Sequence, residues 1–557
     1  MPDTLSYFSI LEKYPLYPLL TFLSFAVYCV GLVVYRLCLS PLSTIPGPKL
    51  AAATSWWILY HDYKNKRTDT ITNLHRRYGP TVRIGPNEVS FTSATAVKDI
   101  YSGASRESGF PKGFLYALFT HYGKYNMFSS LTSEEHSWRR RMFASSYSLT
   151  NIINRESKHG HIWKTVGDYL NYIRKDGYRD GNTPSYAVDI YPANIYYACD
   201  NITGHIFGGE LATKALGSRI DNAQSGQQRD ALDDWYIPTR RELIYLWTDF
   251  NTPLRYFDNC EWIVHKIVNF VQQRRDPDVE YAGGTFIHHY AYTALLSSKT
   301  SPVTEPTVAE KLLSEKKSDR VPRDFDEFGA ASETMDHILA GMDTTGDTLS
   351  FLLFLLSLPE HHAYQDVIRD NLPEMPPFGQ PPSVATITQI MTNPYVNSAI
   401  KETLLIFPAI PVTLPRVVPS GGRVIDGFRL PEGTLASSSV YAVNQSLLPG
   451  FEKNISSSKW TPSRWLIESD ADRDRVQELE RRLWSFGSGG RGCIGKHLAL
   501  VEMSLLLAAI LSHFRLRQTD DCPIEIKHSN WTARRSFRDL AYMDEFNGII
   551  RFEAFKE

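Results

Sequence analysis

A glycine-rich loop around Cys493 carries the residue types of a thiolate metal ligand. The loop reads Phe486-Gly487-Ser488-Gly489-Gly490-Arg491-Gly492-Cys493-Ile494-Gly495 and comes directly before a stretch typical of a helix. A cysteine binds a metal as the thiolate, which the amides and dipole at a helix start favour. Glycines let further amides point at the sulfur, Phe486 can shield it from water, and Arg491 can bind a carboxylate through two hydrogen bonds. The loop therefore predicts a metal-ligating thiolate at Cys493.

The glycines of this loop also match a dinucleotide-binding pattern. Gly487, Gly489 and Gly492 form G-x-G-x-x-G. That pattern binds a dinucleotide only after a buried strand and at the start of a βαβ unit. The preceding residues, Arg481-Arg482-Leu483-Trp484, are not a buried strand. We therefore reject a nucleotide-binding loop at this position.

The same loop resembles the haem-binding signature F-x-x-G-x-R-x-C-x-G of the cytochrome P450 family. Its five fixed positions are matched by Phe486, Gly489, Arg491, Cys493 and Gly495. The resemblance extends over residues 45–557, and their Gly-Pro-containing stretch at 77–90 is similar to fungal microsomal members. It implies that Cys493 is the axial ligand of the iron of haem b and that the other four residues contact this cofactor. Gly495 would let the flat macrocycle approach the chain closely.

A second segment, Ala340-Gly341-Met342-Asp343-Thr344-Thr345, resembles the oxygen-binding motif of the same family. In a helix, Thr344 can donate a hydrogen bond to the carbonyl of Ala340, four residues back, and bend the helix. We expect the small Ala340 and Gly341 to leave room for dioxygen. The resemblance implies that Asp343 and Thr344 are the catalytic residues, relaying protons to the bound oxygen.

Three basic or titratable residues resemble the family's contacts to the haem propionates. His136 and Arg140 are four residues apart and share one helix face, and Arg416 follows Leu414-Pro415. His136 occupies a position where the family often has tryptophan. The run from Arg139 to Arg141 and the later Lys496 could also meet an acidic redox partner, although a solvated basic surface is an equally good interpretation.

Two positions depart from the family pattern. The segment Lys401-Glu402-Thr403-Leu404-Leu405 has leucine where E-x-x-R requires arginine, and Ser463 stands where glutamate is usual. Glu402 could still pair with Arg464, but a buried ion network that loses one partner is normally destabilised by about 3–5 kcal/mol. We expect the fold to have compensated, with apolar surroundings at Leu405.

The composition is that of a globular protein and excludes several other classes. The 557 residues are 43% hydrophobic and 22% charged, with a formal net charge of −2. This balance argues against nucleic-acid binding, which favours a strongly basic face. The six cysteines contain no C-x-x-C pair, and H-E-x-x-H is absent, so we expect neither a disulfide scaffold nor a zinc site.

Residues 14–35 predict a single transmembrane helix. They carry no charged side chain, and a helix of this length, about 33 Å, would cross a hydrocarbon core of about 30 Å. A cleaved signal peptide would have a basic start and a small-residue cleavage site, whereas Asp3 and Glu12 precede this segment and basic residues follow it. The distribution favours an uncleaved anchor (1–40) with the rest in the cytosol. A Pro-rich hinge (41–50) and a catalytic domain (51–557) would follow.

The patterns in the catalytic domain predict a mainly α fold with small β-sheets, as in the cytochrome P450 fold. Helices are expected at 325–358, from a cap at Asn393 to Pro408, and at 494–513. Strands are expected at 81–84 and 88–91, and short strands within 412–443.

Together these features predict a haem-thiolate monooxygenase of the endoplasmic reticulum membrane. The resemblance implies a hydrophobic small-molecule substrate and electrons from NADPH through NADPH-cytochrome P450 reductase, with cytochrome b5 as a second candidate donor. The similarity to fungal members favours polyketide or terpenoid secondary metabolism. Two alternatives stay open at this point. One is a haem-thiolate isomerase or dehydratase that does not need O2, and the other is a non-catalytic haem sensor.

Overall fold

The structure is a computed structural model of the whole chain. The residues whose structure is described here are 16–64, 66–102, 109–179, 185–217, 227–230, 232, 286–300, 307–315, 325–451, 459–519 and 548–555.

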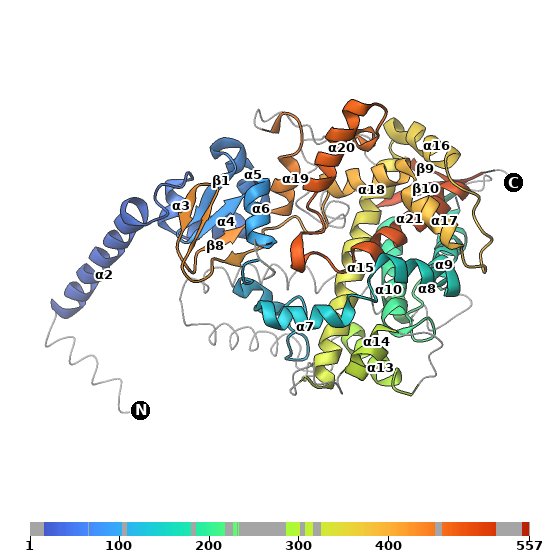
Figure 1. Cartoon of the computed structure of the whole chain (residues 1–557), viewed down its shortest axis with the longest axis horizontal. Helices are drawn as coiled ribbons and strands as arrows, with labels where there is room; N and C mark the ends of the chain where they lie inside the picture. Colours follow the sequence, from blue (N-terminus) through green and yellow to red (C-terminus); the bar gives the residue numbers. More distant parts are fainter. Residues whose placement is uncertain are drawn as a thin grey trace.

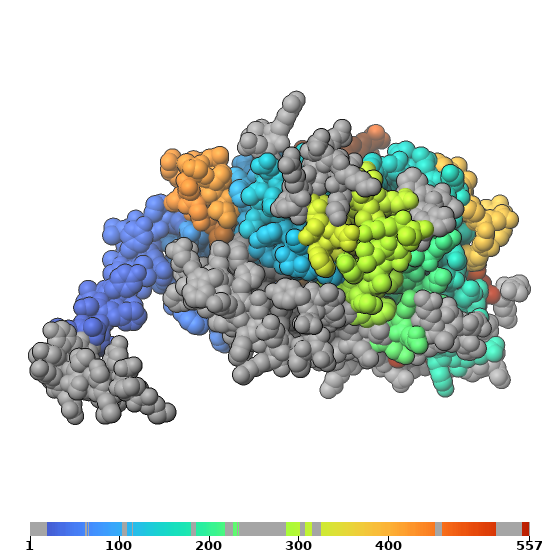
Figure 2. All heavy atoms as spheres, turned by 90° about the horizontal axis from the view of Figure 1, so that it is seen from below, coloured from blue at the N-terminus to red at the C-terminus, as the bar shows by residue number. Residues whose placement is uncertain are grey.

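Helices make up most of the described residues, as the sequence predicts. The α-helices are α2 (Leu16–Val34), α3 (Lys49–Ala53), α4 (Trp56–Tyr63), α5 (Arg67–Tyr78), α6 (Ala94–Tyr101), α7 (Ser133–Phe143), α8 (Leu149–His159), α9 (His161–Asp176), α10 (Ile190–Phe207), α13 (Phe286–Ser297), α14 (Val308–Glu315), α15 (Glu327–Ser357), α16 (His362–Asp370), α17 (Val384–Thr392), α18 (Pro394–Ile406), α19 (Val440–Gln445), α20 (Asp470–Arg482) and α21 (Lys496–His513). Helices α13 and α14 lie on the face shown in Figure 2, beside α7.

The strands form three small sheets. They are β1 (Thr81–Gly85), β2 (Glu88–Phe91), β3 (Tyr178–Arg179), β4 (Ser185–Asp189), β5 (Arg416–Val417), β6 (Arg423–Ile425), β7 (Phe428–Leu430), β8 (Leu435–Ser437), β9 (Phe514–Gln518) and β10 (Ile549–Ala554). One sheet has the order β1-β2-β8-β5, the second β3-β4-β10-β9, and β6 pairs with β7. The predicted strands at 81–84 and 88–91 are thus confirmed, whereas the last part of 412–443 is the helix α19 rather than a strand.

The long helix α15 runs through the middle of the helical part (Figure 1). Asp326 caps it by accepting a hydrogen bond from the Gly329 amide at 2.8 Å. It packs along α10 at very close range, because a Cβ atom on Gly341 would lie 2.6 Å from Ile202 and one on Gly346 would lie 2.6 Å from Ile195. Gly341 therefore serves helix packing against α10, which differs from its expected role of making room for dioxygen.

The starts of helices α18 and α21 can be compared with the positions that the sequence predicts. The Asn393 side chain accepts from the amides of Tyr395 and Val396, at 2.9 and 3.1 Å, and caps α18 as predicted. Helix α21 begins at Lys496, two residues later than expected. The amides at its start are therefore those nearest Cys493.

Helix α2 projects away from the body in both views (Figures 1 and 2). It continues into one π-helical turn at Tyr35–Leu39. Among the described residues, three helices are long and apolar enough to cross a membrane, and Leu19–Leu39 has none of its most apolar window buried, whereas α15 and α21 are mostly buried. The following residues pack on the body, because Leu42 and Ile45 are buried in a cluster with Val89 and Phe91 of β2.

Candidate functional site

The loop before α21 folds tightly back on itself and presents Cys493 at its end. The Cys493 amide donates to the Phe486 carbonyl at 2.8 Å, and the Gly487 amide donates to the Trp484 carbonyl at 2.9 Å. Gly487 and Gly489 have φ values of 65° and 67°, a conformation that side chains disfavour. A Cβ atom on Gly489 would also lie 2.7 Å from the Ser102 backbone, so this glycine packs against the chain after α6. A Cβ atom on Gly495, by contrast, would have only the Cys493 sulfur within 4 Å, at 3.9 Å, so the space beside this glycine is open.

The surroundings of the Cys493 thiol act in opposite directions on its ionisation. Neighbouring protein atoms partly desolvate the thiol, and this raises its pKa. The Gly495 and Lys496 amides and the Arg140 and Lys496 charges oppose the shift, because each favours the thiolate. The cysteine nevertheless keeps an exposed surface. A sulfur that is surrounded by anion-stabilising groups yet open on one side can ligate a metal as the thiolate.

After its accessible first turn, helix α15 is buried except over one short stretch in its middle. From Gly329 to Ile338 and again from Thr345 to Ser357 its residues are buried, whereas Ala340 is exposed and Asp343 and Thr344 are half-buried. The Thr344 hydroxyl donates to the Ala340 carbonyl at 2.7 Å, as predicted. The accessible middle stretch of the helix therefore contains Ala340, Asp343 and Thr344 of the segment that resembles an oxygen-binding motif.

A cluster of cations surrounds His136 on α7. Their positive charges, together with burial, lower the pKa of His136 to about 2, so the ring is neutral. We name this group, Lys112, Arg140, Arg416 and Arg491, the cation cluster. Burial and, to a smaller extent, the Arg416 charge lower the pKa of Arg491 to about 10. In the described part of the chain the Nε atoms of Arg416 and Arg491 are buried without a hydrogen-bond partner.

These orphaned donors fit the haem that the sequence resemblance implies. Buried cations are stable only when they are paired with anions. Arg416 is held by the rings of Tyr101 and Tyr116, each with its centroid 5.1 Å from the guanidinium carbon, and Arg491 donates to the Ser133 hydroxyl at 3.1 Å. None of these contacts brings a negative charge. Two propionate groups would supply it, and Cys493 would bind the iron.

The structure separates the three arginines of the run 139–141. Arg140 donates to the Gly492 carbonyl at 2.7 Å, next to Cys493. Arg139 is buried and its Nε atom lies 2.7 Å from Glu333 of α15. It therefore does not belong to a basic surface for a redox partner, whereas Arg141 and Lys496 are exposed.

Lys112 belongs to the cation cluster, although the sequence analysis did not identify it as a site residue. Its backbone bridges to Arg416, which places the two side chains together. The ammonium group donates to the carbonyls of Met127 and Phe128, at 3.2 and 2.6 Å. A lysine between Pro111 and Gly113 has no pattern that predicts burial, so only the pairing with β5 reveals its position.

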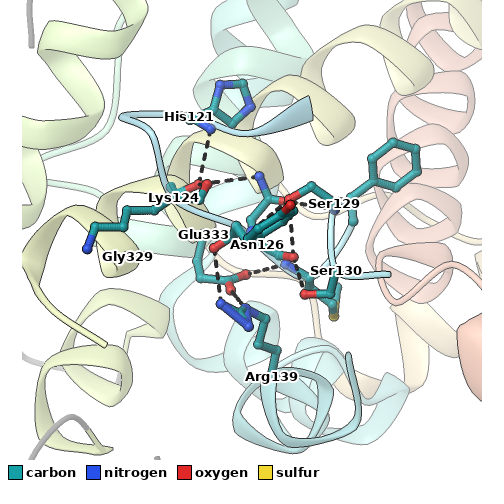
Figure 3. Close-up of polar contacts among 12 residues, drawn as sticks. His121, Lys124, Asn126, Ser129, Ser130, Arg139, Gly329 and Glu333 are labelled. Carbon is teal, nitrogen blue, oxygen red and sulfur yellow. Dashed lines mark hydrogen bonds and ion pairs between the residues drawn. The ribbon is translucent and has the colours of Figure 1, made fainter. Parts of the chain in front are cut away.

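A network of hydrogen bonds clamps the loop 121–130 to α15 (Figure 3). The Glu333 carboxylate pairs with Arg139 and accepts from the Met127 amide at 3.0 Å. The Ser332 hydroxyl accepts from the Asn126 side chain at 3.3 Å. Asn126 is fully buried, and its Oδ1 atom accepts from the Ser129 amide at 2.8 Å. The clamp fixes the loop against the helix that carries Asp343 and Thr344.

The cluster around Glu402 is complete without the missing arginine. The buried carboxylate accepts from Arg464 Nε at 3.1 Å, from the Trp465 indole at 2.8 Å and from the Thr461 amide at 2.9 Å. Leu405 is fully buried in the main apolar core. The Asn444 side chain donates to the Leu404 carbonyl at 3.1 Å. The indole and the amide thus provide donors where the family pattern has an arginine, and the expected compensation is present.

Comparison with known proteins agrees with this geometry. The family model of cytochrome P450 matches residues 46–536. The chain is 28% identical to cytochrome P450 monooxygenase sdnE of Sordaria araneosa, with 94% of this chain and 97% of that protein aligned. It is 26% identical both to cytochrome P450 monooxygenase MO6277 of Ascocoryne sarcoides (92% and 95% aligned) and to cytochrome P450 monooxygenase gsfF of Penicillium aethiopicum (92% and 94%).

The match spans most of the chain, and the site combines an accessible cysteine with a cluster of cations. The chain belongs to the cytochrome P450 family. Its relatives are monooxygenases, which are oxidoreductases.

Proposed function

We propose that this protein is a monooxygenase that inserts one oxygen atom from O2 into a hydrophobic small molecule. The observation that carries the proposal is the pairing of an accessible Cys493 with the cation cluster around His136. When bound, the haem would supply dioxygen activation. Within the site, Cys493 would ligate the iron, and Arg416, Arg491 and Lys112 would bind the propionates, beside His136. Phe486, Gly489 and Gly495 would shape the loop that approaches the macrocycle.

In this proposal the chain's own residues deliver protons along the open stretch of α15. Thr344 keeps its hydroxyl against the Ala340 carbonyl, where its oxygen can accept a proton from Asp343 or from water. This pair favours oxygen chemistry over the isomerase, dehydratase and sensor alternatives, because none of those needs a proton relay.

Thr344→Ala is expected to uncouple cofactor consumption from product formation. Without the hydroxyl, protons would arrive less selectively, so NADPH oxidation would continue while hydrogen peroxide replaced product. The ratio of peroxide to NADPH consumed measures this. Thr344→Ser should stay coupled, because serine keeps the hydroxyl. Thr348→Ala should also stay coupled: Thr348 lies one helical turn after Thr344, and its hydroxyl donates to the Thr344 carbonyl. Equal coupling in Thr344→Ala and the wild type would show that Thr344 only shapes the helix.

Electrons are proposed to come from NADPH through a separate reductase, with cytochrome b5 as a second possible donor. Arg141 and Lys496 are exposed and could meet an acidic partner. We propose, from the resemblance of residues 77–90 to fungal microsomal members of the family, a tailoring step on a polyketide or terpenoid.

The protein is proposed to be anchored in the endoplasmic reticulum by the helix that ends at Leu39, with its body in the cytosol. Protease added to sealed microsomes is therefore expected to digest the body, and immunoblotting with antibodies to the C-terminal part would show the loss. A lumenal marker protein should stay intact as the control. Protection of the body until detergent is added would reverse this topology.

A further inference from the structure

A polar cavity lies between helices α8 and α14, outside the candidate site. Its volume is about 1290 Å³, and its walls also include residues just before α8, just after α13 and at the first position of α15. None of the described residues that line it belongs to the cation cluster or to the accessible middle stretch of α15. The mechanism proposed above therefore makes no use of this cavity.

The lining of this cavity carries more positive than negative charge. Its described residues include four cations and two carboxylates, namely Arg155, Lys158, Lys299, Lys311, Glu310 and Glu327. Both carboxylates are engaged. Glu327 lies 2.5 Å from the Lys299 ammonium group. Glu310 accepts from the Thr307 amide at 3.2 Å and so caps the start of α14. In the described part of the chain, neither Lys158 nor Lys311 has a carboxylate partner.

Hydrogen bonds hold several of the polar side chains in place before any ligand binds. Arg155 donates to two backbone carbonyls near the end of α10, at 2.9 and 3.1 Å. The Lys311 ammonium group donates to the Ser145 hydroxyl. The Asn151 side chain donates to the Ser145 carbonyl at 2.7 Å. Because these groups are already ordered, a ligand that binds them loses less of its affinity to side-chain entropy.

The size and chemistry of the lining favour a polar, anionic small molecule. Pockets for small ligands are usually about 300–1,000 Å³, so this cavity has room for more than a bare anion. Its described lining contains no Phe, Tyr or Trp on which a nucleobase could stack. Leu313 is its one aliphatic residue, whereas Ser146, Asn154 and Ser314 offer hydroxyl and amide groups to the hydroxyls of a ligand.

We propose that this cavity binds a phosphate ester of a sugar or polyol. Lys158 from α8 and Lys311 from α14 neutralise the phosphate group, and the serine and asparagine side chains bind the hydroxyl groups of the ligand. The inference is independent of the proposed function, because it uses none of the residues assigned to the haem or to proton delivery.

Isothermal titration calorimetry of the purified full-length protein tests this site with four probes. They are glucose 6-phosphate, glucose, inorganic phosphate and AMP, each titrated near pH 7, where a phosphate monoester is mostly dianionic. Glucose 6-phosphate should bind about tenfold tighter than inorganic phosphate and than AMP, because only it offers both the anion and the sugar hydroxyls. Glucose alone should give no measurable binding.

Substitutions then assign the binding to this cavity. Lys158→Gln and Lys311→Gln should each weaken the binding of glucose 6-phosphate about tenfold, because each removes a charge-assisted hydrogen bond. The matched control is Lys164→Gln, an exposed position on α9 outside the cavity, which should keep the wild-type Kd. Thermal unfolding without ligand shows whether each variant keeps its fold, and added glucose 6-phosphate should raise the melting temperature of the wild type and of Lys164→Gln.

Three results would overturn the inference. One is the same affinity for glucose 6-phosphate in the wild type and in both cavity variants. Another is the absence of saturable binding of any phosphate probe to the wild type. The third is tightest binding of AMP that is lost in Lys311→Gln, which would make the cavity a nucleotide site.

Discussion

Cys493→Ala is expected to abolish both the haem-thiolate absorbance and the oxygenation of substrate. Alanine removes the proposed iron ligand. The neighbouring Gly495 and Lys496 amides are hydrogen-bond donors and cannot take the place of the thiolate. The absorbance at about 450 nm of the reduced protein with carbon monoxide, which thiolate ligation gives, should be lost.

The matched control is Cys199→Ala. Cys199 is a buried cysteine of α10 that accepts a hydrogen bond from Thr213, so its loss tests the effect of removing a thiol elsewhere in the core. This variant should keep the absorbance band. A normal band in Cys493→Ala would show that another residue ligates the iron.

Leu405→Arg, which restores the family pattern, is expected to destabilise the protein by about 3 kcal/mol or more and to lower its haem content. The guanidinium would replace an apolar side chain in the main core, and a buried charge without a partner is costly. The Glu402 carboxylate cannot serve as that partner without giving up Arg464, Trp465 or Thr461. Thermal unfolding and the haem-to-protein ratio measure the two effects.

Two further variants separate charge from shape at this position. Leu405→Met conserves volume and should cost less than about 1.5 kcal/mol. Trp465→Phe removes the indole donor to Glu402 and should cost about 1–3 kcal/mol, because the carboxylate is left partly unsatisfied. A rise in both melting temperature and haem content in Leu405→Arg would mean that Glu402 lacks a partner in the wild-type protein.

The sequence predicts the elements whose ends carry local signals. Asn393 and Pro394 start α18 because the cap and the first-turn proline act through neighbouring atoms, and Pro359 limits α15 in the same way. The segment 440–445 contains Val440 and Val443 and resembles a strand, but Ser439 caps it as a helix through the Ala442 amide. Helix boundaries are thus predictable where capping decides them.

The candidate site is only partly predictable, because its cations come together through long-range pairing. Cys493 and Thr344 belong to contiguous motifs and can be found directly. Lys112 and Arg416 are joined by a backbone bridge between distant segments. Arg139 and Arg140 are adjacent in the sequence, but they point to different partners, Glu333 and the Gly492 carbonyl, because successive helix residues face different directions.

The carbon monoxide difference spectrum of the reduced wild-type protein tests the central claim most directly. Purified full-length protein is reduced with dithionite, saturated with carbon monoxide and compared with the reduced sample alone. A thiolate from Cys493 opposite the gas predicts a band at about 450 nm that scales with haem content. A haem-containing protein whose band lies only at shorter wavelength, or a folded protein that binds no haem, would contradict thiolate ligation at this site.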